Sequence, residues 1–222
     1  MNRAKVHTNK PLLILLYGFP GAGKTHFSRN MTEHLESAHV HGDKIRNELF
    51  EEPRFDKQEN SIIKHLMDYM AEEFLTAGVS VVYDTNMMRK ADRHVMRELA
   101  RKKGAKTLLV WFQIDADTAF KRLGTRDRRT ADDKYAVEYS QQDFREYASM
   151  MQHPEPTEDY VVVSGKHTFG SQKNAVFKKL IESGHIDPMQ GQSKVAMPGL
   201  INLVPNSMKG RVDMSRRNIR IN

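Results

Sequence analysis

Short apolar runs alternate with longer mixed stretches along most of the sequence. Nearly continuous runs of Val, Leu, Ile and aromatic residues are typical of strands that are covered on both faces. Three of the runs are of this kind, whereas the second run is short and is assigned to a strand mainly from its position. The predicted strands are Leu12–Tyr17, His39–His41, Val79–Asp84, Leu108–Ile114 and Tyr160–Ser164.

The stretches between these runs have helical spacing. In Asp56–Thr76 the apolar residues form a stripe along one helical face, and Gly78 follows the end. Asp115 is suited to cap a helix over Ala116–Leu123. The other predicted helices are Lys24–Ser37, Ile45–Phe50, Arg89–Lys103, Val137–Met151 and Ser171–Ser183. This alternation predicts an α/β fold with a parallel sheet that helices cover on both faces.

The pattern changes after Gly184, so we expect one domain over residues 1–185 and a basic, partly irregular tail over residues 186–222. The tail carries six Lys or Arg and two Asp, which is +4 of the net charge of +7. Such a tail could bind nucleic acid or another polyanion. A solvated tail without a ligand explains the same composition.

Composition excludes several classes of protein. The 222 residues include no cysteine, so a disulfide framework and a thiolate metal site are both excluded. The apolar run Leu12–Leu16 is far shorter than the roughly 20 residues of a membrane helix, and the N-terminus lacks the features of a signal peptide. We therefore expect a cytoplasmic protein that does not bind membranes.

The glycine-rich segment Gly18–Thr25 fits the pattern G-x-x-x-x-G-K-[ST] in full, between a predicted strand and a predicted helix. In such a loop the backbone N–H groups and the helix N-terminus face phosphate oxygens. Lys24 would reach the β- and γ-phosphates, and the Thr25 hydroxyl would ligate Mg²⁺. The predicted ATP-binding residues of this loop are Gly18, Pro20, Gly21, Ala22, Gly23, Lys24, Thr25 and His26.

Asp43 and Arg46 follow the second predicted strand. The carboxyl ends of parallel strands border the ligand crevice, so Asp43 would stand near a phosphate acceptor and could take the proton of an attacking hydroxyl. Arg46 would share its helical face and could neutralise a phosphate. The spacing supports a second interpretation equally well, in which Asp43 only caps the helix Ile45–Phe50.

The third predicted strand runs into Asp84. An apolar strand that ends in Asp is similar to the strand whose carboxylate supports Mg²⁺ in P-loop proteins, so Asp84 is predicted as a metal residue beside Thr25. Its carboxylate could instead orient the acceptor, or the sequence Asp84-Thr85-Asn86 could be a simple strand-end turn.

Four arginines lie between residues 122 and 129. A segment of this kind can close over the nucleotide, exclude water and add positive charge to the transition state. We therefore predict a lid that contains Arg122, Arg126, Arg128 and Arg129, although the sequence does not say which of them acts. The histidines 26, 65, 94 and 153 show no metal-ligand spacing, and we expect structural or surface roles for them.

Together these motifs resemble a known group of P-loop kinases. G-x-P-G-x-G-K-T, then D-x-x-R, then D-T-N, then an Arg-rich lid are similar to the group that includes the phage polynucleotide 5′-hydroxyl kinase domain and the zeta-toxin-like kinases, with an AAA-type ATP-binding domain. The resemblance covers roughly residues 12–183. It implies a sheet of strand order 2-3-1-4-5, with ATP as the donor and Mg²⁺ as the metal.

The resemblance also implies roles by position. Asp43 matches the general base, and Arg46 matches an arginine near the acceptor and the scissile phosphate. Arg122 and Arg126 match arginines of the lid, and Asp84 matches the acidic residue of the D-T-N turn. Lys24 and Thr25 match the residues that bind the donor.

We therefore predict an ATP-dependent kinase with Lys24, Asp43, Arg46 and Arg126 as catalytic residues. A polynucleotide 5′-hydroxyl acceptor fits the basic tail and the resemblance, whereas a small metabolite or a nucleotide fits the compact size. An alternative of another class is an ATP-binding switch or adaptor that hydrolyses ATP slowly.

Overall fold

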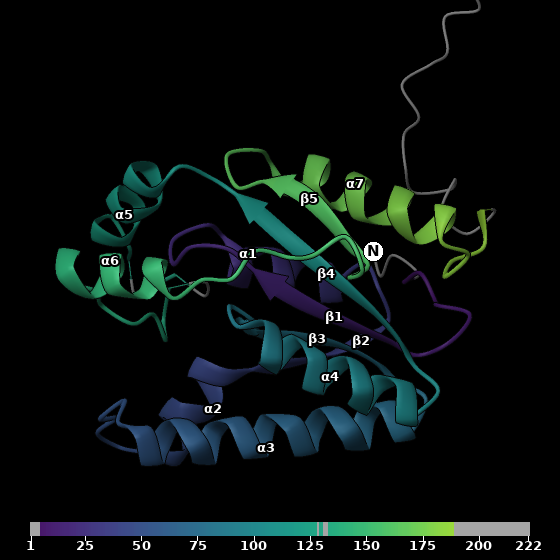
Figure 1. Cartoon of the computed structure of the whole chain (residues 1–222), viewed down its shortest axis with the longest axis horizontal. Coiled ribbons are helices and arrows are strands. Elements are labelled where there is room, and N and C mark those ends of the chain that lie inside the picture. The colour runs from purple at the N-terminus through teal and green to yellow at the C-terminus, as the bar shows by residue number, and fades with distance from the viewer. Residues whose placement is uncertain (1–4, 128, 131–132, 189–222) are drawn as a thin grey trace, which may run out of the picture.

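The computed structural model describes residues 5–127, 129–130 and 133–188. In this part of the chain the strands form one parallel sheet of order β2-β3-β1-β4-β5 (Figure 1). The strands are β1 (Leu12–Tyr17), β2 (Ser37–His41), β3 (Ser80–Asn86), β4 (Lys106–Gln113) and β5 (Tyr160–Ser164). This sheet confirms the predicted fold class and the strand order that the resemblance implies.

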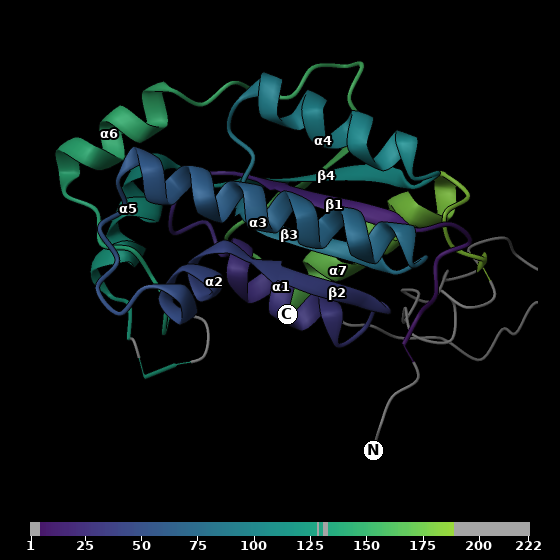
Figure 2. The same cartoon turned by 90° about the horizontal axis from the view of Figure 1, so that it is seen from below.

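Helices cover both faces of the sheet (Figures 1 and 2). They are α1 (Lys24–Thr32), α2 (Gly42–Leu49), α3 (Lys57–Thr76), α4 (Lys90–Lys102), α5 (Ala116–Gly124), α6 (Gln141–Ser149) and α7 (Phe169–Glu182). α1 and α7 pack on one face, and α3 and α4 pack on the other. α5 and α6 lie beyond the arrowheads of the strands (Figure 1).

The central strand β1 contributes to two separate hydrophobic clusters. Leu12, Ile14 and Leu16 pack under α1 and α7, whereas Leu13 and Leu15 pack under α3 and α4. All five side chains are buried. Burial of such a side chain contributes about 1.5–3 kcal/mol, which explains why β1 is apolar at every position rather than at alternate ones.

The helix predicted over Lys24–Ser37 ends at Thr32 instead. The residues that follow bond to the N-terminal segment of the chain. The Val6 N–H donates to the His34 carbonyl, and the Glu36 N–H donates to the Val6 carbonyl. These non-local hydrogen bonds compete with the helical ones, and local sequence spacing carries no sign of them.

α2 begins at Gly42, earlier than the predicted Ile45–Phe50. Its N-cap is His41, without a hydrogen bond from the side chain, and Asp43 lies inside the first turn. The interpretation of Asp43 as the helix cap is therefore wrong. A carboxylate in the first turn still interacts favourably with the positive end of the helix.

α6 is shorter than the predicted Val137–Met151. The Ser140 hydroxyl accepts a hydrogen bond from the Asp143 N–H, and the Asp143 carboxylate accepts one from the Ser140 N–H. This reciprocal capping box fixes the start of the helix at Gln141.

β3 runs to Asn86, two residues beyond its predicted end, and it contains a bulge. Along β1 the pairing steps from Leu15 opposite Tyr83 to Leu16 opposite Asn86. On the other side β2 stays in regular register, with His41 opposite Asp84. The end of β3 therefore presents Asp84 to β2 and Asn86 to β1.

A buried ion pair ties α4 to the connection between α6 and β5. The guanidinium of Arg93 donates to both carboxylate oxygens of Glu158 at 2.7 and 2.9 Å, and the two side chains are 0% and 2% exposed. Arg93 also donates to the carbonyls of Met87, Gln152 and His153. Burial by itself raises the pKa of the Glu158 carboxyl, but the hydrogen bonds from Arg93 and from the Glu155 N–H, together with the charge of Arg93, hold the pKa below its usual value.

No helix in the described part of the chain is long and apolar enough to cross a membrane. Most of the basic tail, residues 189–222, lies outside the described residues. The boundary near residue 185 and the binding of nucleic acid by the tail therefore stay predictions.

Candidate active site

The carboxyl ends of the strands border a cleft with a volume of about 450 Å³. The cleft is lined by residues of the glycine loop, by carboxylates and by arginines of the predicted lid, which come from separate elements. The predicted site residues that line the cleft are Pro20, Gly21, Gly23, Lys24, Thr25, His26, Asp43, Asp84, Arg122 and Arg126. The predicted residues Gly18, Ala22 and Arg46 are not part of this lining.

Backbone geometry explains two glycines of the loop. Gly21 and Gly23 have φ values of 83° and 92°, in the left-handed region that other residues rarely adopt. A Cβ atom at Gly21 would also lie 2.3 Å from the carbonyl oxygen of Ala119 in α5. Gly23 is the N-cap of α1, so the positive end of α1 faces the cleft.

Gly18 and Ala22 shape the loop from behind. The Gly18 N–H donates to the side-chain oxygen of Asn86 at 3.2 Å. Ala22 is fully buried in the cluster under α1 and α7, and its N–H donates to the Phe19 carbonyl. Both residues therefore fix the loop conformation, while their neighbours face the cleft.

Lys24 lies against its own loop. Its ammonium donates to the carbonyls of Gly18 and Phe19, both at 2.9 Å. Desolvation lowers the pKa of Lys24 to about 8, although the charge of Asp84 opposes this shift. A phosphate beside the ammonium would favour its charged form and raise that pKa.

Thr25 and Asp84 meet at the entrance to α1. The Thr25 hydroxyl donates to Asp84 Oδ1 at 3.4 Å, and the Asp84 side chain is 3% exposed. A hydroxyl and a carboxylate are hard oxygen donors, so the two residues fit the predicted Mg²⁺, whose other ligands would be phosphate and water.

Asp43 faces the same cleft from the first turn of α2. Burial raises the pKa of the Asp43 carboxyl and the charge of Asp84 adds to the rise, whereas His41, Arg46 and Arg126 oppose it. The net direction is upward. A carboxylate with a raised pKa is a stronger base toward a hydroxyl proton.

The structure does not bring Arg46 into the cleft, contrary to the prediction. Its guanidinium is buried against α3, where it donates to Glu59 and to Asn60, both at 2.6 Å. The same group lies 4.6 Å from the ring centre of Phe55. Arg46 shares the helix of Asp43, but its guanidinium pairs with the carboxylate of Glu59 on α3 and does not line the cleft.

Two of the predicted lid arginines lie at the cleft. Arg122 donates to the Gly165 carbonyl at 2.7 Å, and Arg126 donates to the Val137 carbonyl at 2.9 Å, and both line the cleft. Arg129 is exposed and pairs with Asp127. Arg128, another predicted candidate, lies outside the described residues.

Three tyrosines in the cleft were not predicted. The Tyr139 and Tyr147 rings meet edge to face at 5.8 Å, and Tyr135 meets His41 in the same way. The Asn86 side chain donates to the Tyr147 hydroxyl at 3.1 Å. The sequence signal for this wall is the recurrence of tyrosine at positions 135, 139 and 147, after the Arg-rich segment.

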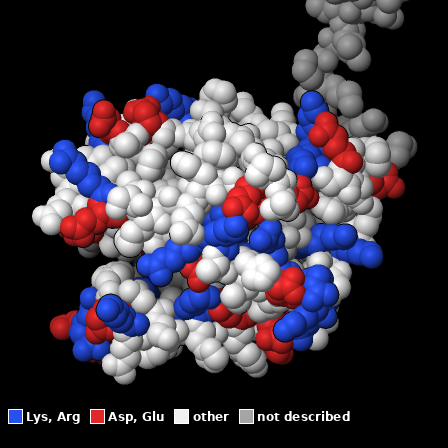
Figure 3. All heavy atoms as spheres, in the orientation of Figure 1, with Lys and Arg blue, Asp and Glu red and all other residues white. Residues whose placement is uncertain are grey.

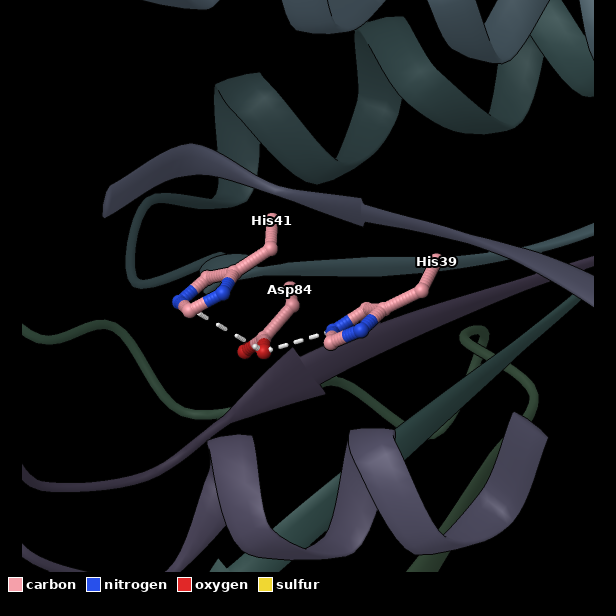
Figure 4. A group of neighbouring side chains, drawn as sticks. All are labelled: His39, His41 and Asp84. Atoms are coloured by element: carbon pink, nitrogen blue, oxygen red, sulfur yellow. Dashed lines mark hydrogen bonds and ion pairs between the residues drawn. The ribbon is translucent and has the colours of Figure 1, made fainter. Parts of the chain in front are cut away.

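Two histidines of β2 lie beside the carboxylate of Asp84, and neither was predicted as a site residue (Figure 4). His39 Nε2 lies 2.9 Å from Asp84 Oδ2, and His41 Nε2 lies 3.9 Å from the same oxygen. The two imidazole rings are stacked with 5.3 Å between their centres.

Comparison with known proteins assigns the chain to a family. The model of the AAA domain family matches residues 13–151, which is more than half of the chain. No curated protein matches the chain.

Several solved structures are similar in fold. They include a candidate kinase from Chloroflexus aurantiacus, with a TM-score of 0.62, 18% identity and coverage of 79% of this chain and 98% of that one. The Mycobacterium tuberculosis APS kinase CysC, bound to AMPPNP and APS, has a TM-score of 0.56, 17% identity and coverage of 78% and 98%. Kti12 from Chaetomium thermophilum, bound to ADP-AlF3, has a TM-score of 0.58, 13% identity and coverage of 80% and 100%.

At these identities the similarity shows the fold alone. The narrower likeness to the polynucleotide kinases and zeta toxins stays a prediction. The family match and the parallel sheet with its glycine-rich loop agree, and the chain belongs to the AAA domain family with a kinase-like P-loop fold.

Proposed function

We propose that this protein is an ATP-dependent kinase that transfers the γ-phosphate of ATP to a hydroxyl group. The observation that carries the proposal is the position of Asp43, which lines the same cleft as Lys24 and Thr25 and whose pKa is raised by burial. A protein that only binds ATP does not need a base at this place. A kinase does, because the attacking hydroxyl must lose its proton.

In this proposal the acceptor oxygen attacks the γ-phosphorus in line, and the bond to the β–γ bridging oxygen breaks to release ADP. The hydroxyl proton moves to the carboxylate of Asp43. Lys24, Arg126 and the N-terminus of α1 stabilise the negative charge that spreads over the phosphate oxygens. Mg²⁺ held near Thr25 and Asp84 would supply further neutralising charge. Positioning and electrostatics provide most of the rate.

The acceptor site is proposed to lie between Asp43 and the wall formed by Tyr135, Tyr139 and Tyr147. Aromatic faces of this kind stack on nucleobases and pack on sugar rings. Two acceptor classes follow, a polynucleotide 5′-end and a small ring-bearing alcohol. Similar folds include a Sinorhizobium meliloti gluconokinase as well as the APS kinase, so the fold does not choose between them.

Surface charge does not favour one class either. On the face seen in Figure 3, Lys and Arg are mixed with Asp and Glu rather than gathered into one positive patch. A polynucleotide acceptor would therefore depend on the cleft and the tail. Salt separates the two classes. A protein that neutralises phosphates releases their counterions, and this release is less favourable at high salt, so polynucleotide binding weakens steeply as the salt concentration rises. Binding of an uncharged alcohol hardly changes.

The test is transfer of labelled γ-phosphate from ATP, offered separately to 5′-hydroxyl DNA, 5′-hydroxyl RNA and a set of small alcohols. The compared proteins are wild type, Asp43→Asn and a matched control, Asp117→Asn, which changes an exposed carboxylate of α5. We expect Asp43→Asn to lose transfer by about 100-fold or more while ATP binding is retained, and Asp117→Asn to match wild type.

Two outcomes would contradict the proposal. Unchanged transfer by Asp43→Asn would remove the role of Asp43 as the base. ATP binding without transfer to any acceptor, together with slow hydrolysis that Asp43→Asn does not alter, would instead support a nucleotide-dependent switch.

A further inference from the structure

We propose that His39, His41 and Asp84 form a binding site for a divalent first-row transition metal, such as Co²⁺, Mn²⁺ or Zn²⁺, beside the P-loop. This inference does not depend on the proposed kinase activity. It rests on the positions, burial and donor chemistry of the three side chains.

Strand geometry brings the three side chains to one face. Side chains alternate along a strand, so His39 and His41 point to the same side of β2, while Val40 between them packs into the cluster under α3 and α4. The register places Asp84 of β3 directly opposite His41. Figure 4 shows both rings pointing toward the Asp84 carboxylate.

The distances fit a site that closes around a cation. One ring nitrogen of each histidine and one carboxylate oxygen of Asp84 all lie within 4.8 Å of one another. A tetrahedral ion at about 2.0–2.2 Å from each ligand separates the ligand atoms by about 3.3–3.6 Å. The ligand atoms must therefore approach each other by at most about 1.5 Å, which side-chain rotation at an edge strand can supply.

The two oxygens of Asp84 face different groups. Oδ1 accepts from Thr25, and Oδ2 faces the histidines. His39 is within hydrogen-bond distance of Oδ2, but His41 at 3.9 Å is not. A structural hydrogen bond that orients Asp84 thus explains His39 and leaves the parallel ring of His41 unexplained. A cation between the three groups explains both histidines.

Burial makes this arrangement selective for a cation. The side chains of Asp84, His41 and His39 are 3%, 10% and 23% exposed, so water solvates the carboxylate poorly. A dication would compensate that negative charge, as buried charges require. Each histidine would bind through its Nε2 lone pair, with the ring proton on Nδ1, and any imidazolium proton would leave to water.

The donor set determines the class of metal. Two imidazoles and one carboxylate suit first-row transition metals, whereas Mg²⁺ prefers oxygen ligands alone. His41 and Asp84 also line the cleft, so the remaining coordination positions would face the space next to the P-loop. The site is therefore distinct in ligands from the oxygen site of Thr25, although both share Asp84.

The test is a titration of full-length protein without an affinity tag and without nucleotide, using Co²⁺ followed by visible absorption and by calorimetry. The variants are His39→Ala, His41→Ala and the double variant. His65→Ala is the matched control, because His65 is exposed on α3. We expect wild type and His65→Ala to bind one Co²⁺ with equal affinity. We expect each single histidine variant to bind Co²⁺ at least about 10- to 100-fold more weakly. Loss of a residue that only hydrogen-bonds to a metal ligand already weakens metal binding by that factor, and the histidines are ligands themselves.

The variant Thr25→Ala tests whether the two carboxylate oxygens of Asp84 have separate roles. It should leave Co²⁺ binding in the absence of nucleotide unchanged, because Thr25 contacts only Oδ1. Mg²⁺ in large excess should fail to displace Co²⁺. Circular dichroism and melting curves check folding, and if the buried His41→Ala variant does not fold, the more exposed His39→Ala carries the test alone.

Three results would overturn the inference. These are an absence of Co²⁺ binding by wild type, equal affinity in the wild type and the histidine variants, and displacement of Co²⁺ by Mg²⁺ in large excess. X-ray absorption of the wild-type Co²⁺ complex gives an independent answer, since a first shell of oxygen without imidazole nitrogen would also refute the site.

Discussion

Replacement of Arg93 by Met tests what holds the connection between α6 and β5. Arg93 is 0% exposed, and Met keeps much of its length without its charge or its donors. Removal of one partner of a buried ion pair costs about 3–5 kcal/mol. The carbonyls of Met87 and Gln152 also lose a donor, and a buried group without a hydrogen-bond partner costs about 1–3 kcal/mol.

Protonation of Glu158 and entry of water would relieve part of this cost. We therefore expect Arg93→Met to lower the free energy of unfolding by about 4 kcal/mol. For a chain of this size that corresponds to a fall in Tm of about 8–16 °C. Because domains are stable by only about 5–15 kcal/mol, the variant should fold but unfold at a much lower urea concentration.

Urea unfolding at pH 7 measures this loss, with the single tryptophan, Trp111 on β4, as the fluorescent probe. Arg101→Met is the matched control, because Arg101 lies on the same helix, is 70% exposed and pairs with Glu98 in solvent. We expect this control to change the urea midpoint little.

A double-mutant cycle with Glu158→Gln isolates the pair. Once Arg93 is replaced, the carboxylate of Glu158 has lost its cation, so its removal should cost much less than it does in wild type. Two results would refute the reasoning: an Arg93→Met midpoint equal to that of Arg101→Met, or single losses that simply add in the double variant.

Three further predictions concern pH and backbone geometry. Since burial raises the pKa of Asp43, the phosphate-transfer rate should fall on acidification at a pH above the usual Asp value of about 3.9, and a pH–rate profile whose acid limb lies at or below that value would contradict it. The pKa of the Glu158 carboxyl is lowered in the folded protein, so the ion pair contributes to stability above the unfolded pKa of about 4.3, and this contribution is lost as the pH falls through the lower folded pKa. The urea midpoint should therefore fall with pH between about pH 7 and pH 3, and Glu158→Gln should reduce this pH dependence. An identical pH dependence in the variant would contradict this. Gly21→Ala combines a positive φ with an approach of 2.3 Å to the Ala119 carbonyl, so it should destabilise the domain by at least about 1 kcal/mol and weaken ATP binding, as calorimetry would measure; wild-type affinity and stability would show that the loop can relax.

The sequence predicted those parts of the molecule that depend on local patterns. β1 and the glycine loop follow from a continuous apolar run and a fixed spacing of glycines and lysine. Asp43 and Asp84 were placed at the same cleft because both follow strands of one parallel sheet, although the order of those strands came from the family resemblance.

Long-range pairing explains what was missed. Arg93 lies on the buried stripe of α4 with Met96 and Ala100, which was a visible sign, but its partner Glu158 is 65 residues away. Arg46 has the predicted spacing from Asp43, yet a carboxylate on α3 captures it.

The histidines of β2 show the same limit. Their alternation was readable from the sequence and places both on one face of the strand. Their approach to Asp84 depends on β2 lying beside β3, which the composition of neither strand reveals.

The bulge at the end of β3 has a consequence for comparing related sequences. Because it lets one short segment serve β2 through Asp84 and the glycine loop through Asn86, the number of residues between Tyr83 and Asn86 is constrained as well as the identity of Asp84. A deletion there would turn Asp84 away from Thr25 or withdraw Asn86 from Gly18. An alignment that places a gap within these residues therefore signals a misaligned gap or a relative that has lost the nucleotide site.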